Sequence, residues 1–168
     1  MLPDDLIAGL MSDFEGLRRQ SSWGETALFY NPGNTFKRGV YFATLKEHDG
    51  ASDSASHLDR ESVFRLAFGL LDADYQRLFG SRPTRPRAGG IVATGHDFTS
   101  LDVLTPHPVY AWMGWVQVLC PTQRTMLTLK PLLSQAHTKA KAAFDKRITR
   151  SLARADREGN QLSLRDES

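Results

Sequence analysis

The stretch TALFYNPGN at residues 26–34, continued by VYFATL at residues 40–45, decides the fold class of this chain. Both flanks are rich in aromatic and β-branched residues, which favour extended backbone. The Asn-Pro-Gly-Asn run between them, residues 31–34, consists of residues that form turns. The two flanks are therefore predicted to pair as antiparallel strands.

Further extended segments follow this hairpin. Apolar side chains at alternate positions share one face of residues 62–68, and Arg65 points from the other face. Residues 109–119 form another such segment, which Gly114 interrupts. Residues 49–57, rich in Ser, Asp and Ala, have almost nothing to bury, so we expect a mobile surface loop there.

Helical spacing marks the first and last thirds of the chain. Apolar residues recur from Leu6 to Leu17, and Arg18 and Arg19 are suited to close this first helix. Residues 72–79 form a short second helix.

A long helix ends the predicted domain, and its starting point is open. If it begins near Thr122, Pro131 removes the hydrogen bond to the carbonyl of Leu127. If it begins near Thr128, Pro131 lies in the first turn, where proline is tolerated.

These elements predict an α+β fold, an antiparallel sheet with helices packed mainly on one face. The length of 168 residues fits one domain, which we place at residues 1–148. Residues 149–168 are poor in apolar side chains, and we expect a basic, disordered tail there.

Charge is distributed unevenly along the chain. Residues 139–168 hold eight Lys or Arg and five Asp or Glu, which leaves 13 basic and 14 acidic residues elsewhere. Neither an apolar run long enough to cross a membrane nor a secretory signal is visible, and the single Cys120 forms no internal disulfide. We therefore expect a cytoplasmic protein, and the oligomeric state is left open.

The order of segments resembles the MmcQ/YjbR-like family of small bacterial α+β proteins, over roughly residues 4–145. The residues that carry the resemblance are the segments 26–30, 41–45, 63–69, 72–79 and 108–119. Within that fold the chain looks closest to an actinobacterial group of unknown function, through residues 23–26, 58–60, 64–66 and 106–110. The resemblance implies a fold and no established reaction, although some family members are described as DNA-binding.

His107 is the candidate catalytic residue, because Pro106 and Pro108 restrict the backbone on both sides of it. A histidine held in this way suits acid–base chemistry. His96 is a further candidate, and Asp97 or Asp102 could orient one of the two imidazoles. The alternative is a loop histidine that is hydrogen-bonded to the backbone.

Arg65 is the candidate ligand-binding residue, since an arginine in an apolar strand can clamp a carboxylate or a phosphate. The alternative is a salt bridge to Asp59 or Glu61. Asp59 and Arg60 line the same candidate pocket or anchor the preceding loop. Aromatic residues supply the pocket floor or, alternatively, core packing; they are Trp23, Tyr110, Trp112 and Trp115.

No histidine pair on a helix face, nucleophile elbow or glycine-rich phosphate loop occurs, so we expect neither a metal nor a cofactor. The favoured interpretation is a small-molecule-binding domain. It extends to an acid–base enzyme of bacterial specialised metabolism that catalyses proton transfer, cyclisation or rearrangement. The alternative is DNA binding through the basic C-terminus, beginning near Lys139. The near-neutral body favours the first interpretation.

Overall fold

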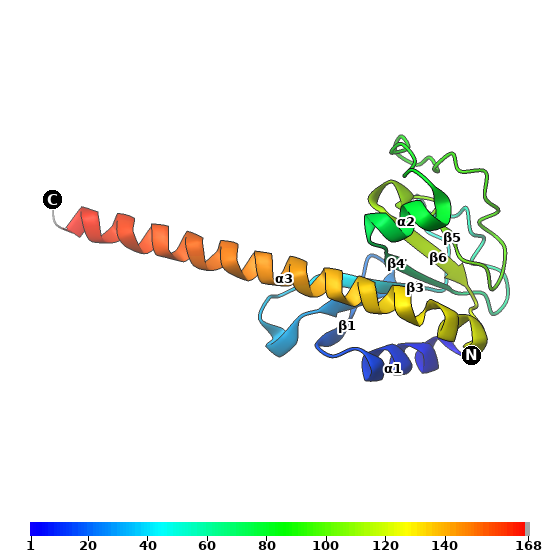
Figure 1. The fold of residues 1–168 in the computed structure, drawn as a ribbon, viewed down its shortest axis with the longest axis horizontal. Coiled ribbons are helices and arrows are strands. Elements are labelled where there is room, and N and C mark those ends of the chain that lie inside the picture. Colours follow the sequence, from blue (N-terminus) through cyan, green and yellow to red (C-terminus); the bar gives the residue numbers. More distant parts are fainter. Residues whose placement is uncertain (167–168) are drawn as a thin grey trace.

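A computed structural model describes residues 1–166, and the burial of side chains through residue 161. The fold is α+β, as predicted, with a six-stranded antiparallel sheet in the order β1-β2-β3-β4-β6-β5 (Figure 1). The strands are β1 Leu17–Ser22, β2 Glu25–Tyr30, β3 Val40–Lys46, β4 Arg65–Gly69, β5 Thr105–Pro106 and β6 Trp115–Leu119. The helices are α1 Pro3–Asp13, α2 Asp72–Phe79 and α3 Gln123–Asp166, with two short 3-10 turns at Pro32–Asn34 and Ala111–Met113.

Helices α1 and α3 lie against one face of the sheet and form the main core with it (Figure 1). Leu10 of α1 and Leu133 and Ala136 of α3 are each less than 5% exposed. They belong to the same apolar cluster as Leu28 and Phe68 of the sheet. This cluster explains the alternating pattern of the strands, because every second side chain faces the helices.

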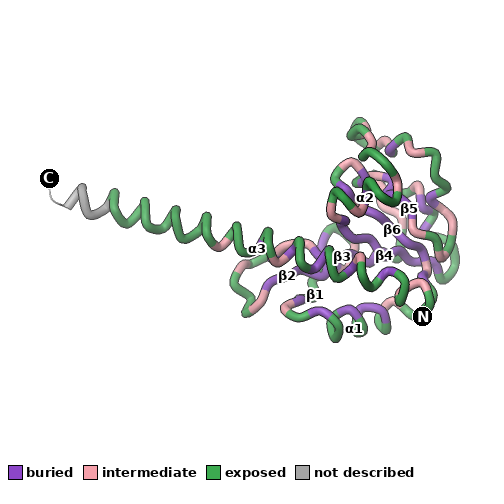
Figure 2. Tube along the Cα trace, in the orientation of Figure 1, coloured by how far each residue is buried: buried purple, intermediate pink, exposed green. Residues whose placement is uncertain are grey.

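The opposite face of the sheet, called the outer face here, is covered by loops instead of helices. One loop follows β3 and another precedes β5, and both contact Gln117 of β6 through Ser56 and the carbonyl of Phe98. Figure 2 shows that the strands beneath these loops are buried. The outer face carries the polar side chains of the sheet, and it is where the candidate residues gather.

The first helix is shorter than the sequence predicted. It ends at Asp13, and Leu17 begins the edge strand β1 instead of a last helical turn. Gly16 makes the break, because it has a φ of 73° and a Cβ there would lie 2.6 Å from the Tyr30 ring. Arg18 and Arg19 therefore lie on an exposed sheet edge, where charged side chains hinder pairing with another chain.

The last helix begins at Gln123, so the first of the two predicted starts is correct and Pro131 lies inside the helix. The structure continues the helix to Asp166, into residues 149–168, where the sequence predicts a disordered tail; residues 167–168 lie outside the described residues. Residues 149–161 are exposed throughout, as Figure 2 shows. None of the described helices combines the length and apolarity needed to cross a membrane.

Candidate functional site

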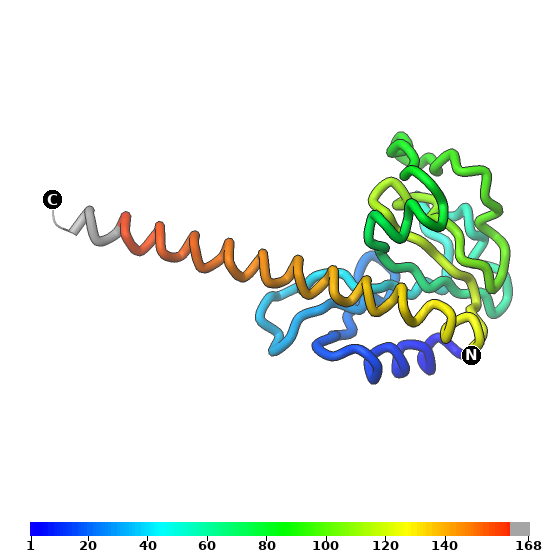
Figure 3. The backbone as a smooth tube through the Cα atoms, in the orientation of Figure 1, coloured from blue at the N-terminus to red at the C-terminus, as the bar shows by residue number. Residues whose placement is uncertain are grey.

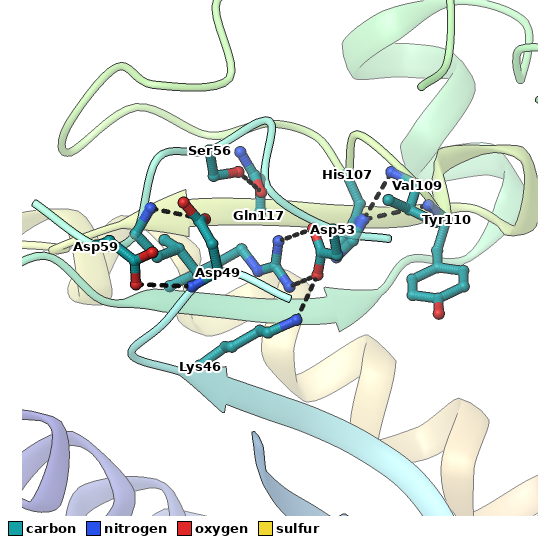
Figure 4. Close-up of polar contacts among 11 residues, drawn as sticks. Lys46, Asp49, Asp53, Ser56, Asp59, His107, Val109, Tyr110 and Gln117 are labelled. Carbon is teal, nitrogen blue, oxygen red and sulfur yellow. Dashed lines mark hydrogen bonds and ion pairs between the residues drawn. The ribbon is translucent and has the colours of Figure 1, made fainter. Parts of the chain in front are cut away.

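A buried ion pair lies at the centre of the outer face (Figure 4). The side chain of Arg65 is only 1% exposed, and its Nη1 and Nη2 donate to Oδ1 and Oδ2 of Asp53 at 2.9 and 2.5 Å. Lys46 donates from Nζ to Oδ2 of the same carboxylate at 3.0 Å. Arg65 thus forms a salt bridge, which was the alternative interpretation, and its partner is Asp53 instead of Asp59 or Glu61.

The register of the sheet explains why this carboxylate is needed. Lys46 and Arg65 are direct cross-strand partners on β3 and β4, and both side chains are buried. Two like charges directly opposite each other repel. Asp53 lies between them and accepts from both, so it relieves the repulsion and fastens its loop to the sheet.

Burial alone would raise the pKa of Asp53. The hydrogen bonds and the positive charge of Arg65 outweigh that effect, and the pKa lies well below its usual range. Asp53 is therefore ionised at neutral pH.

The loop that carries Asp53 is held at several points, so the expectation of a mobile loop with nothing to bury was wrong. Ser56 is 1% exposed and donates from Oγ to Oε1 of Gln117 at 2.9 Å. Asp59 accepts from the backbone N–H of Asp49, and Arg60 donates to the carbonyls of Ser56 and Thr99. Asp59 and Arg60 thus anchor the loop, which was the alternative interpretation of this pair.

His107 is 2% exposed and is also hydrogen-bonded to the backbone. Its Nδ1 accepts from the N–H groups of Val109 and Tyr110 at 3.0 and 3.1 Å (Figure 4). The ring proton of the neutral imidazole is therefore on Nε2. Burial, and then the positive charge of Arg65, lower the pKa of His107 well below about 6.5. With its lone pair occupied, this ring is poorly equipped to accept a proton from a substrate.

The other two candidate catalytic residues are engaged elsewhere. Asp102 accepts from the N–H and the hydroxyl of Thr122 at 2.7 and 3.1 Å, immediately before α3 begins. The exposed His96 ring packs edge-on against Phe79, with 5.5 Å between centroids. No hydrogen bond among the described residues joins His107 to either of them.

Replacing Asp102 with alanine is expected to lower the free energy of unfolding by about 1 kcal/mol, because α3 loses an N-terminal acceptor. Asp102→Asn keeps an oxygen at the same place and should lose less. Urea denaturation of both variants measures the difference. Equal stability of Asp102→Ala and the parent protein would contradict the capping role.

Glu25 joins the outer-face cluster from β2, and sequence analysis did not single it out. It is partly buried, and burial raises its pKa, with the positive charge of Arg65 in partial opposition. The Asp53 and Glu25 carboxylates both raise the pKa of Tyr110, after the larger effect of burial. Glu25, Asp53, Arg65 and Tyr110 are thus close enough to feel one another's charge.

The aromatic candidates differ in their placement, because Trp112 packs against the core while Trp23 and Tyr110 are exposed. Trp23 is 84% exposed at the tip of the β1–β2 hairpin, two residues before Glu25. Tyr110 is 45% exposed, and its ring lies 5.0 Å from that of His107. The partly buried Trp115 meets Tyr41 edge-on at 6.3 Å. Tyr110 therefore offers exposed aromatic surface beside the charged cluster, and Trp23 offers it at the hairpin tip that precedes Glu25.

Three residues of the cluster, Lys46, Asp53 and Glu25, were missed by sequence analysis. No sequence pattern indicated a role for Asp53, because it lies in a loop whose apolar and polar residues do not alternate with a helix or strand period. Lys46 would have been found by aligning the hairpin with residues 62–68, since the register places it opposite Arg65. In the described part of the chain, no group of three metal-ligating side chains is gathered that could hold a metal ion.

Comparison with known proteins yields a family without an assigned activity. No curated protein and no solved structure matches the chain. The resemblance to MmcQ/YjbR-like proteins and to an actinobacterial group accordingly stays a prediction. A family model covers residues 1–149. This range includes the whole predicted domain, residues 1–148, and leaves out all but the first residue of the predicted tail. The chain belongs to DUF6194, a family of unknown function.

Proposed function

We propose that the domain binds a small polar organic molecule on the outer face, between the Trp23 hairpin tip and Tyr110. The observation that carries the proposal is the cluster of Glu25, Asp53 and Arg65 beside these two exposed aromatic side chains. Binding sites for small molecules commonly combine aromatic surface with a few convergent polar groups.

The electrostatics of the cluster support this proposal. Its two carboxyl groups have pKa values displaced in opposite directions, downward for Asp53 and upward for Glu25. Such divergence is common where one group stays charged and the other exchanges a proton. Asp53 is fixed by two cations, whereas the Glu25 carboxylate forms no ion pair with any described residue and has the Thr44 side chain as a hydrogen-bond partner.

Two buried polar atoms on the same face add a second line of support. Nε of Arg65 and Oγ1 of Thr105 have no hydrogen-bond partner among the described residues. A buried polar group without a partner is costly, and such groups concentrate where function requires them.

The same residues are equipped for proton transfer without a cofactor. Glu25 takes the acid–base role that sequence analysis gave to His107, because the His107 lone pair is occupied. Tyr110 can donate a hydrogen bond to a developing oxyanion, and Arg65 supplies fixed positive charge below. A proton transfer, cyclisation or rearrangement of the bound molecule fits this equipment.

A screen of polar metabolites by thermal shift, followed by calorimetry, tests the proposal. We expect at least one ligand to stabilise the protein, by about 2.7 kcal/mol at a concentration 100 times its Kd. Glu25→Gln and Tyr110→Phe should each weaken that ligand roughly tenfold, the cost of one good hydrogen bond to a charged group.

Glu47→Gln is the matched control, because it removes an exposed carboxylate from the next position after β3. Melting curves without ligand verify that each variant is folded. A ligand whose affinity is the same in Glu25→Gln, Tyr110→Phe and Glu47→Gln would place its site elsewhere and contradict the proposal.

A further inference from the structure

The structure brings basic side chains from three distant segments onto one surface. The segments are β1, the connection from β2 to β3, and the part of α3 that leaves the domain. Figure 3 shows the β2–β3 connection beside the helix where its colour passes from yellow to orange. The side chains, together called the basic tract here, are Arg18, Lys37, Arg38, Lys146, Arg147 and Arg150.

Contacts fix the position of this tract. Arg147 donates from Nη1 to the carbonyl of Arg38 at 2.7 Å, which ties α3 to the β2–β3 connection. Arg18 donates from Nε to Oδ1 of Asn34 at 3.2 Å, which ties β1 to the same connection. These contacts join the three segments, and Lys146 and Arg150 are the exposed basic residues on either side of Arg147 in the sequence of α3.

Positive charge in the tract is uncompensated. Within the part of the chain that the structure describes, no carboxylate lies within ion-pair distance of any of its six members. Arg19 lies at the border of the tract, because it pairs with Asp4 at 3.1 Å. Asp145 is the acidic residue that directly precedes the α3 members of the tract in the sequence. The near-neutral total charge of the body conceals this local excess.

A hollow of about 470 Å³ lies within the tract. Cationic and neutral polar side chains line it together with the Phe29 and Phe36 rings, and no carboxylate contributes to it; the polar residues are Arg18, Arg19, Gln20, Asn31, Asn34, Thr35 and Lys37. Cations and neutral hydrogen-bond donors around an open depression suit a phosphate group.

The guanidinium of Arg147 is already fixed in position, which favours binding of a phosphate group. The Arg147 side chain is exposed, and its Cζ lies 3.8 Å from the centroid of the Phe36 ring. Stacking and the bond to Arg38 fix one face of the guanidinium, so its other face can meet a phosphate or a base with little further loss of entropy.

We propose that the basic tract binds the phosphodiester backbone of nucleic acid without reading its sequence. The tract runs from a sheet edge to a projecting helix, which is longer than a single small anion requires. Its apolar side chains are Phe29, which is 1% exposed, and Phe36, which lies under the Arg147 guanidinium, so neither is free to insert into a membrane. Backbone contacts by Arg and Lys are the sequence-independent part of nucleic-acid recognition.

Fluorescence anisotropy with a labelled duplex of about 20 base pairs tests the proposal on the full chain. We expect binding at low salt that weakens steeply as salt rises, since each phosphate contact contributes about 0.9 to the slope of log K against log salt. Arg18→Gln combined with Lys37→Gln should reduce that slope by about 2 and the affinity on the order of tenfold. Arg147→Gln should reduce the slope by about 1.

The matched control combines Arg87→Gln with Arg124→Gln, which removes the same charge from exposed, unpaired arginines outside the tract. An equal loss in this control would overturn the tract as the site, and so would the absence of binding at low salt. A polyglutamate competitor that displaces the protein as readily as unlabelled duplex would overturn the assignment to nucleic acid and indicate an acidic protein partner.

Discussion

Arg65→Met is expected to lower the free energy of unfolding by about 3–5 kcal/mol, the usual cost of removing one partner of a buried ion pair. Arg65 is 1% exposed and holds Asp53 by two hydrogen bonds. Its loss leaves a carboxylate that is only 13% exposed, with Lys46 as its remaining partner. Urea denaturation at neutral pH measures the change.

A double-mutant cycle with Asp53→Asn separates the ion pair from the packing of the Arg65 stem. The double variant should lose clearly less stability than the two single variants together, because neither charge is left without the other. Arg77→Met is the control, since its partner Asp74 lies on a helix surface and such pairs contribute about 0–1 kcal/mol. Losses that add within about 0.5 kcal/mol would contradict coupling between Arg65 and Asp53.

The strands that sequence analysis found are those whose apolar residues alternate beside strong turn formers. The hairpin of β2 and β3 and the position of Arg65 on the face opposite Leu66 were confirmed. Strand β1 was missed because the buried residues Phe14 and Leu17 are three positions apart. That spacing fits a continued helix as well as a helix that ends and turns into a strand. The left-handed backbone of Gly16 distinguishes the strand from the helix. The need for glycine at this position follows from its close contact with the Tyr30 ring, which is known only from the structure.

The sequence predicts that Arg65, His107 and Tyr110 lie near one another, but it does not indicate their hydrogen-bond partners. Arg65, His107 and Tyr110 do gather on one face, as the sequence suggested. Their roles depend on partners that carry no periodic signal, above all Asp53 from the loop and the backbone N–H groups that His107 accepts. Hydrogen bonds between distant segments follow from tertiary packing, which local spacing does not encode.

His107 gives the domain a predictable loss of stability in mild acid. In the folded state, burial and the charge of Arg65 keep the pKa of the ring well below about 6.5, the value expected in the unfolded chain. Below that pH the unfolded state binds a proton that the folded state refuses, so the free energy of unfolding falls as pH falls. Its contribution is complete above about pH 6.5 and decreases by about 1.4 kcal/mol between pH 7.5 and 5.5.

His107→Asn isolates this effect, because an asparagine oxygen can accept from the backbone N–H groups of Val109 and Tyr110 and does not titrate. Urea denaturation of parent and variant at both pH values gives the difference, and the exposed His48, His57 and His96 cancel in the comparison. The parent should lose about 1.4 kcal/mol more than the variant on acidification. If both lose the same amount, the folded ring accepts the proton, and His107 would then be available as an acid–base group after all.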